Sequence, residues 1–454
     1  MSQAWEPHKY QEDAIEFAIK RDGSGLMLDP GMGKTSITLA VIDILKSVKE
    51  IRKTLVIAPL RVCKTVWRQE GKKWINFNHL KIIDLCNLRI TERSALIAGP
   101  GDVYLINPES CTKVLDMLGK DFDLLVLDES TKFKDTQTQR FKALKKKLFD
   151  FKRRMILTGT PVPNGLQDLF GQMFVVDFGA ALGKYVTHFR MEFMHQRPGD
   201  AYGWHLNRGA PELIYKRVAN RLMRLDAKDH LDMPPLVNNF ILTDMPERQR
   251  VQYKALEKDF VTQMGDHAIA VFNASAVGTK LRQMANGFIY ENQGTALVSR
   301  TATRLHTEKL DALEELIEEM QGRPLLVAYE FEEDAAMIES RFPEAINLGK
   351  AKDPAKVVDQ FNAGIIPVLY AHPASVGHGL NMQEACNTVC WYGITWNLEF
   401  YIQFIDRVYR QGQKSAVIVH HLVCRGTKDE AVMQALGDKE KTQAAFNRAI
   451  TKVA

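Results

Sequence analysis

The sequence has no long apolar run, no signal-peptide core and no cysteine pattern. A membrane span needs about 18 or more consecutive apolar residues; there is no such run, and the opening MSQAWEPHKYQ has no apolar core. Most of the 6 cysteines lie in apolar stretches. Cys386 and Cys390 have no second pair and no well-spaced histidines, which argues against zinc. These absences predict a soluble intracellular protein with reduced, buried thiols.

Extremes of composition are also absent. The chain has 454 residues, 45% of them hydrophobic, and its 60 basic and 55 acidic side chains give a net charge of +5. One hydrophobic core rarely exceeds about 250–300 residues, so two domains are expected. One basic cluster stands out and fits either a solvated helix face or a nucleic-acid contact. Its members are Lys142, Lys145, Lys146, Lys147, Lys152, Arg153 and Arg154.

Two series of short apolar runs, each alternating with helical patterns, indicate two α/β blocks. The first series comprises residues 26–28, 54–58, 103–107, 124–127 and 155–158. The second comprises 324–328, 345–348, 368–372, 388–392 and 416–423. Near-continuous apolar strands of this kind suit parallel sheets covered on both faces.

The segment between the two blocks has a different pattern. Residues 166–235 show no clear strand, and the helical pattern of 211–235 ends at Pro234 and Pro235, which cannot continue a helix. The expected domains are a first lobe (1–165), a helical insertion of that lobe (166–235), and a second lobe (236–454) with a helical insertion at about 246–300.

A phosphate-binding loop follows the first apolar run, in the string DPGMGKTS. Gly31 and Gly33 let the backbone curl around phosphate oxygens, Lys34 can reach the terminal phosphates, and the Thr35 hydroxyl can ligate Mg²⁺. Leu28 stands where the strict pattern has its first glycine. A glycine-rich turn with a surface lysine is the alternative, which the strand before the loop and the helix after it disfavour.

An acidic pair follows another buried run. Residues 124–127 lead into Asp128 and Glu129. An aspartate at the end of a buried strand is placed to hold Mg²⁺, and the adjacent glutamate can polarise the attacking water. An ordinary acidic strand end is the alternative, and the upstream loop favours the catalytic interpretation.

Further strings complete an ordered series of motifs. They are HKYQ (8–11), GMGKT (31–35), VIAPLRV (56–62), INPES (106–110), DEST (128–131), LTGTPVPN (157–164), SVGHGLNMQEA (375–385) and QFIDRVYRQGQK (403–414). In this order they resemble the motifs of superfamily-two helicases and, within these, of Swi/Snf-type double-stranded DNA translocases. HKYQ looks like the Q motif, which reads adenine, GMGKT like motif I, DEST like motif II and LTGTPVPN like motif III. PLLVAYE (324–330), SVGHGLNMQEA and QFIDRVYRQGQK resemble motifs IV, V and VI. The resemblance spans nearly the whole chain.

The resemblance implies two RecA-like lobes, with parallel sheets flanked by helices and helical insertions between motifs III and IV. It implies an ATP hydrolase that uses ATP and Mg²⁺ and is stimulated by DNA. The implied ATP-binding residues are Gln11, Gly31, Met32, Gly33, Lys34, Thr35, Ser36 and Gly377, with Thr35 and Asp128 holding Mg²⁺. The implied catalytic residues are Lys34, Asp128, Glu129, Arg407 and Arg410. Candidate DNA contacts are Arg61, Lys64, Lys132, Lys134 and Asn381.

The arginine pair of motif VI is expected to act from the second lobe. A spacing of three places Arg407 and Arg410 on one face of a helix. Their forked positive charge can stabilise the transferring phosphate when the lobes close. Nucleic acid that lies across both lobes would then stimulate hydrolysis.

One residue differs from the common form of its motif and narrows the set of proteins that the chain resembles. Asp406 stands where many remodellers have glycine, and an acidic residue there is similar to the subgroup that contains annealing helicases. A core of this size resembles bacterial or phage members. We therefore expect a cytoplasmic protein (nuclear in a eukaryote), a monomer without membrane contact, that translocates on duplex or branched DNA and has a possible protein partner for targeting.

Two alternatives to translocation remain open. One is a strand-separating helicase on DNA or RNA. The other is an ATP-gated nucleic-acid clamp that serves a partner protein. A small-molecule P-loop kinase is disfavoured because it leaves motifs III, V and VI without a role.

Overall fold

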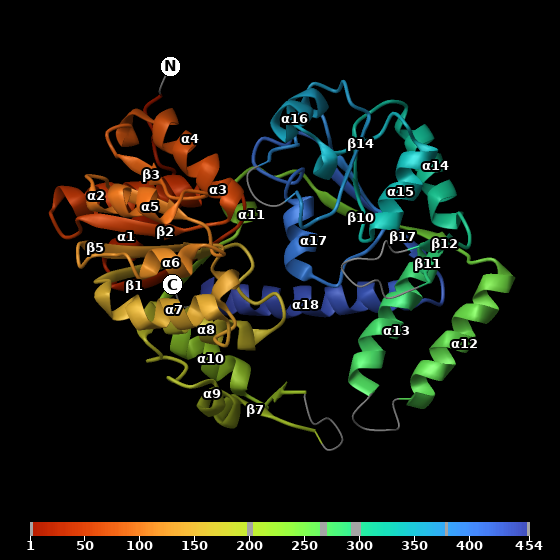
Figure 1. The fold of residues 1–454 in the computed structure, drawn as a ribbon, viewed down its shortest axis with the longest axis horizontal. Helices are drawn as coiled ribbons and strands as arrows, with labels where there is room; N and C mark the ends of the chain where they lie inside the picture. Colours follow the sequence, from red (N-terminus) through yellow and green to blue (C-terminus); the bar gives the residue numbers. More distant parts are fainter. Residues whose placement is uncertain (1–2, 198–202, 264–269, 292–300, 377–379, 452–454) are drawn as a thin grey trace. The chain divides into compact units, whose positions relative to one another are not determined.

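The computed structural model describes residues 3–197, 203–263, 270–291, 301–376 and 380–451. The chain forms two compact units (Figure 1). The first comprises Met1–Asp232 with Lys439–Ala454, and the second comprises Met233–Asp438. The segment from Lys439 onward thus belongs to the first unit, whereas the sequence pattern predicts it as part of the second lobe. In the part of the chain that is described, no helix is long and apolar enough to cross a membrane.

The first unit is built on a 7-stranded parallel sheet of order β3-β4-β2-β5-β6-β1-β9. Its strands are β1 (Gly23–Leu28), β2 (Lys53–Ile57), β3 (Ile82–Asp84), β4 (Val103–Ile106), β5 (Phe122–Asp128), β6 (Arg153–Thr158) and β9 (Leu222–Leu225). Its helices are α1 (Lys9–Ile19), α2 (Lys34–Ser47), α3 (Leu60–Lys64), α4 (Val66–Lys73), α5 (Ile90–Ala98), α6 (Cys111–Leu115), α7 (Gln139–Lys147), α8 (Leu169–Asp177), α9 (Val186–Phe193), α10 (Ala210–Val218) and α11 (Ala227–His230). A short hairpin joins β7 (Met194–His195) and β8 (His205–Leu206).

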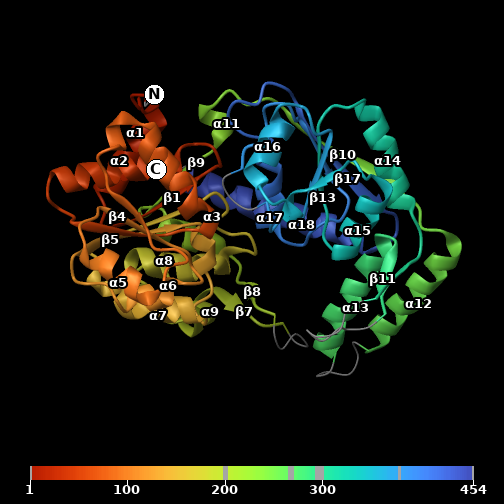
Figure 2. The same cartoon turned by 45° about the horizontal axis from the view of Figure 1, so that its top comes forward.

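The second unit is built on a 6-stranded parallel sheet of order β10-β17-β16-β13-β15-β14. Its strands are β10 (Leu236–Thr243), β13 (Leu325–Ala328), β14 (Ile346–Asn347), β15 (Val368–Ala371), β16 (Thr388–Trp391) and β17 (Val417–Cys424). Its helices are α12 (Glu247–Gln263), α13 (Ala270–Ala285), α14 (Glu308–Met320), α15 (Glu332–Arg341), α16 (Pro354–Asn362) and α17 (Leu398–Ile405); α18 (Lys428–Thr451) begins in this unit. Helices α12 and α13 pack side by side (Figures 1 and 2), and a hairpin of β11 (Phe288–Tyr290) and β12 (Ala302–Arg304) follows them.

The buried strands explain the apolar runs of the sequence. All seven residues of β5 are buried, because β2 and β6 flank this strand and helices cover the sheet. A strand that meets helices on both faces has no solvent-exposed side, so the run of residues 124–127 is apolar on both faces, and the buried aspartates Asp123 and Asp128 lie near its two ends. The predicted class, two parallel sheets flanked by helices, is confirmed.

Strand β9 was not predicted and lies inside the stretch expected to be helical. Leu222 and Leu225 are buried, and Gly25 in β1 pairs with Leu222. The helical pattern is real on either side, in α10 and α11, but pairing with the sheet edge overrides local propensity over these four residues. The absence of strands that was predicted for 166–235 is therefore wrong.

Candidate ATP site and associated motifs

The glycine loop joins β1 to α2 as predicted. Gly31 and Gly33 have φ of 84° and 81°, in the left-handed region that favours glycine. A Cβ on Gly33 would lie 2.4 Å from Nε2 of Gln11, so a side chain at this position would displace the Gln11 amide. Lys34 is the first residue of α2. The loop thus leads directly into the start of a helix, where free backbone amides favour an anion, and its predicted binding of phosphate stays a prediction.

Three side chains form hydrogen bonds to backbone carbonyls of this loop and of the strand end before it. Lys34 Nζ donates to the carbonyl oxygens of Leu28 and Asp29, at 2.8 and 3.3 Å, so the amine lies along the loop. Gln11 Nε2 donates to Met32 O at 3.1 Å, and the Tyr10 hydroxyl donates to the same oxygen at 3.3 Å. The HKYQ motif is thus tied to the phosphate loop, and its predicted role in reading adenine stays a prediction.

The acidic pair lies at the carboxyl end of β5. Strand register places Asp128 beside Leu157 of β6, which in turn pairs with Leu26 of β1, so Asp128 and the residues before the loop lie near the same edge of the sheet. Glu129 has φ 57° and ψ 62°, a left-handed conformation that is uncommon for a residue with a side chain. Such outliers persist where the surrounding structure enforces them, and they cluster at functional sites.

The residues at this edge of the sheet fit a Mg²⁺ ion that is bound to the phosphates of a nucleotide. Within the described ranges, no group of three or more His, Cys, Asp or Glu side chains could hold a metal ion. Mg²⁺ that is bound to nucleotide phosphates needs only one or two carboxylates from the protein, together with waters and hydroxyls. Asp128, at the end of its strand, and Thr35, in the first turn of α2, are the residues that would hold it.

Motif III is bonded to motif II by side chains that the sequence did not single out. The buried Gln172 of α8 accepts from Ser130 Oγ at 2.6 Å and donates to Pro161 O at 2.7 Å. Asp168 Oδ2 accepts from Asn164 N at 2.9 Å and from Lys134 Nζ at 3.1 Å. Two of these hydrogen bonds join residues that are more than 30 positions apart in the sequence. A local sequence pattern cannot reveal contacts of this kind.

Arg224 of β9 links the phosphate loop to motif III and was also missed. Its side chain is 4% exposed and forms ion pairs with Asp29 and Asp226. The guanidinium donates to Met27 O at 3.2 Å and to Gly159 O at 3.1 Å. The one signal for Arg224 in the sequence is the arginine-rich stretch in which this residue lies.

Replacing Arg224 with Met should lower the free energy of unfolding of the first unit by about 3 kcal/mol. Breaking a buried pair leaves its partner charge uncompensated, at a cost of about 3–5 kcal/mol, and the lower end applies because Asp29 is partly exposed. Urea unfolding followed by circular dichroism measures the change. Arg89→Met is the matched control, because Arg89 is 82% exposed and such pairs contribute at most about 1 kcal/mol. Equal destabilisation by the two changes would contradict the prediction.

The motif VI arginines lie in the second unit, beyond the end of a helix. α17 ends at Ile405, so the prediction that Arg407 and Arg410 share one helix face is wrong. Arg407 Nε donates to Gln403 O at 2.9 Å and its Nη1 donates to Leu380 O at 3.2 Å. Arg410 bonds to the side chain of Asn381, and burial near Arg407 lowers the pKa of Arg410 to about 10.

These contacts join motif VI to motif V. Met382 N also donates to Arg407 O at 2.9 Å, so the two motifs are bonded through backbone and side chains. Gln413 Nε2 extends this link by donating to Cys386 O at 2.9 Å. Gly377 lies outside the described residues, and its predicted part in ATP binding stays a prediction.

The candidate DNA contacts of the first unit differ in their surroundings. Arg61 is partly buried, its Nη1 has no hydrogen-bond partner among the described residues, and burial lowers its pKa. Lys64 is exposed and Lys132 is half-buried. Lys134 is paired with Asp168, which offsets part of its charge. Their contact with DNA stays a prediction.

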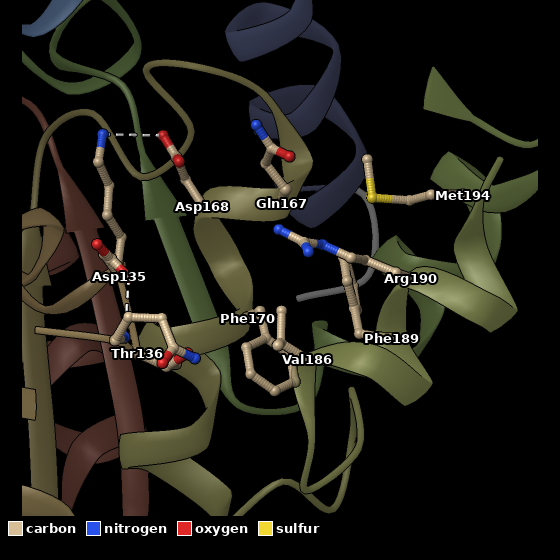
Figure 3. Close-up of a pocket in the computed structure, with 11 residues that line it drawn as sticks. Asp135, Thr136, Gln167, Asp168, Phe170, Val186, Phe189, Arg190 and Met194 are labelled. Carbon is tan, nitrogen blue, oxygen red and sulfur yellow. Dashed lines mark hydrogen bonds and ion pairs between the residues drawn. The ribbon is translucent and has the colours of Figure 1, made fainter. Parts of the chain in front are cut away.

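A cavity of about 430 Å³ in the first unit is lined by residues 134–137, by the start of α8 and the residues just before it, and by α9 (Figure 3). Phe170, Val186 and Phe189 give it an apolar side. Asp135 lies on one side of the view, and Arg190 lies on the other. Because its polar lining carries both signs of charge, the cavity does not by itself indicate a ligand.

In the first unit, the first strand of a parallel sheet leads through a glycine loop into a helix, and an acidic pair lies at the end of β5, which β6 separates from β1. This arrangement defines a P-loop nucleotide-binding protein. The SNF2-related domain matches residues 10–293, and the helicase conserved C-terminal domain matches residues 308–412. The chain belongs to the SNF2-related family of ATPases, and membership implies nucleotide binding and ATP hydrolysis.

Several relatives align over almost the whole chain. It is 34% identical to putative protein p41 of Acyrthosiphon pisum secondary endosymbiont phage 1, covering 96% of this chain and 97% of that protein. It is 25% identical to the SWI/SNF-related matrix-associated actin-dependent regulator of chromatin subfamily A-like protein 1 of Xenopus laevis, covering 97% of this chain and 44% of that protein. It is 24% identical to the human DNA annealing helicase and endonuclease ZRANB3, covering 96% and 41%. The chain thus spans less than half the length of these two animal relatives.

A solved structure is also similar. The Sulfolobus solfataricus SWI2/SNF2 ATPase core in complex with dsDNA is 23% identical, with a TM-score of 0.45, over 98% of this chain and 95% of that one.

Proposed function

We propose that this protein couples ATP hydrolysis to translocation on double-stranded or branched DNA. The observation that carries the proposal is the division of parts between two parallel-sheet units: the glycine loop and acidic pair in one, the bonded motifs V and VI in the other. An enzyme that only binds and hydrolyses ATP has no need for the second set. The printed name of the human relative, a DNA annealing helicase, supports branched DNA as a substrate.

In the proposed reaction each motif has one task. Lys34 and the loop amides bind the phosphates, and Thr35 with Asp128 would hold Mg²⁺, which neutralises developing charge when bound. Glu129 orients the attacking water. Arg407 and Arg410 stabilise the charge on the transferring phosphate.

The DNA contacts in this proposal go to phosphates. Arg61, Lys64, Lys132 and Lys134 in the first unit, and Asn381 in the second, would bind the backbone without reading bases. Such binding weakens steeply as salt rises, because neutralising phosphates releases counterions. The sequence of the DNA should therefore matter little, and ionic strength should matter greatly.

We expect duplex or branched DNA to raise the ATPase rate at least about tenfold, because arginine-assisted transfer gains up to about 10³–10⁵ when the motifs assemble. The rate is measured with duplex, branched and single-stranded DNA at several salt concentrations. Displacement of a triplex strand without separation of the duplex supports translocation. Release of a duplex strand would favour the helicase alternative, and binding without displacement would favour the clamp. No stimulation by any nucleic acid would contradict the motor.

A further inference from the structure

Helix α4 is bonded to both segments that would hold Mg²⁺. Trp67 Nε1 donates to Asp128 Oδ2 at 3.0 Å, and the two side chains are 0% and 8% exposed. One turn further along α4, Glu70 Oε2 accepts from Ser36 Oγ of α2 at 2.8 Å. The same oxygen accepts from Trp74 Nε1 at 2.6 Å. One short helix therefore contacts the end of β5 and the first turn of α2.

The same helix continues the segment that carries two candidate DNA contacts. α3, with Arg61 and Lys64, is separated from α4 by Thr65 alone. Thr65 donates to Arg61 O through its amide at 2.9 Å and through its hydroxyl at 2.8 Å. Gln69 N donates to Thr65 O at 2.9 Å, so the bonds run without a break from α3 into α4. A displacement of α3 would therefore be passed to α4.

We propose that Trp67 is a positioning residue for Asp128, and that α4 transmits DNA contact at α3 to the Mg²⁺ site. The proposal rests on the proposed function. Rotation of a carboxylate about its last torsion is only weakly restricted by the side chain itself. A fixed indole N–H in a buried setting selects one orientation, and groups that orient metal ligands commonly set metal affinity. Trp67 touches neither nucleotide nor metal in this scheme; it acts through Asp128.

The test is Trp67→Phe, which keeps an aromatic ring and removes the donor. Mg²⁺ is titrated into protein with a fluorescent, non-hydrolysable ATP analogue, and the half-saturating Mg²⁺ concentration is read from nucleotide binding. Loss of a group that orients a metal ligand commonly costs about 10–100-fold in affinity, so the half-saturating concentration should rise by that factor. Affinity for the analogue in EDTA should stay at the wild-type value.

Trp74→Phe is the matched control. It removes an indole donor from the same region, but that donor reaches Glu70 rather than Asp128. Its half-saturating Mg²⁺ concentration should stay near the wild-type value. If Trp67→Phe unfolds at a lower temperature, 3-benzothienylalanine at position 67 repeats the test, because sulfur replaces the N–H and the ring keeps its volume.

The transmission is tested by adding duplex DNA. DNA should lower the half-saturating Mg²⁺ concentration of the wild type and of Trp74→Phe, and should have little effect on Trp67→Phe. An unchanged Mg²⁺ requirement in Trp67→Phe would overturn the positioning role, and a wild-type response to DNA in that variant would overturn the transmission. Either result leaves the proposed function intact, whereas a wild type that hydrolyses no ATP with any DNA would remove the proposed function itself.

Discussion

Replacing Glu129 with Gln should reduce ATP turnover by about 10²–10⁴-fold, the range that a positioned general base supplies. The amide keeps the size of the side chain and cannot accept the proton of the attacking water. ATP binding should persist, because the glycine loop and Asp128 are unchanged. Phosphate release under saturating ATP and DNA, together with the dissociation constant of an ATP analogue, measures the two effects.

The surroundings of Glu129 make this substitution informative. The residue holds a left-handed backbone conformation at the end of β5, and Gln imposes the same backbone cost as Glu. Glu6→Gln, at an exposed position of the first unit, is the matched control and should hydrolyse ATP at the wild-type rate. Near-normal turnover by Glu129→Gln would remove this residue from the proposed mechanism.

Replacing Arg407 with Ala should cut DNA-stimulated turnover by about 10³-fold or more, since an arginine that stabilises the transferring phosphate contributes about 10³–10⁵. ATP binding should be spared, because the nucleotide is bound mainly by the first unit in the proposed scheme. Single-turnover hydrolysis with DNA measures the rate, and binding of an ATP analogue gives the affinity.

Arg407 also donates a hydrogen bond to motif V, so Arg407→Ala is compared with a second variant at the same position. Arg407→Lys keeps the positive charge but lacks the planar fork, and it should remain at least about tenfold impaired if the fork contacts phosphate. Arg425→Ala, a change at a half-exposed arginine of the same unit, should turn over ATP normally. A variant of Arg407 that loses nucleotide binding and keeps the turnover rate would contradict the proposed role.

The sequence predicts well those parts of the site that depend only on a few neighbouring residues. The glycine loop and the acidic pair each directly follow a buried apolar run, and the structure has the loop after β1 and the pair at the end of β5, as this local pattern predicts. The contacts that hold these parts in place are of another kind. Trp67 and Asp128 are 61 positions apart, and Ser130 and Gln172 are 42 apart. A buried indole or amide looks like ordinary core residues until the fold shows its partner.

Two further differences arise from tertiary context. Spacing by three predicted a shared helix face for Arg407 and Arg410, but the helix ends at Ile405 and side-chain bonds to motif V hold the following turn. The basic cluster fits a solvated helix face or a nucleic-acid contact by sequence, yet its member Arg154 belongs to β6, is 3% exposed and is paired with Asp22. Charge counts along a sequence do not separate a buried ion pair from a solvated face.

The segment from Lys439 onward has a consequence for the order in which the protein can be made. Phe446 and Ile450 are fully buried in the core of the first unit, and Gln443 accepts a hydrogen bond from Val162 N in motif III at 3.1 Å. Translation starts at the N-terminus, so these residues are added only after the whole second unit has been synthesised. The ATP-binding unit therefore cannot complete its core while it is being translated, and a fragment that ends at Asp232 would expose an apolar surface where α18 belongs.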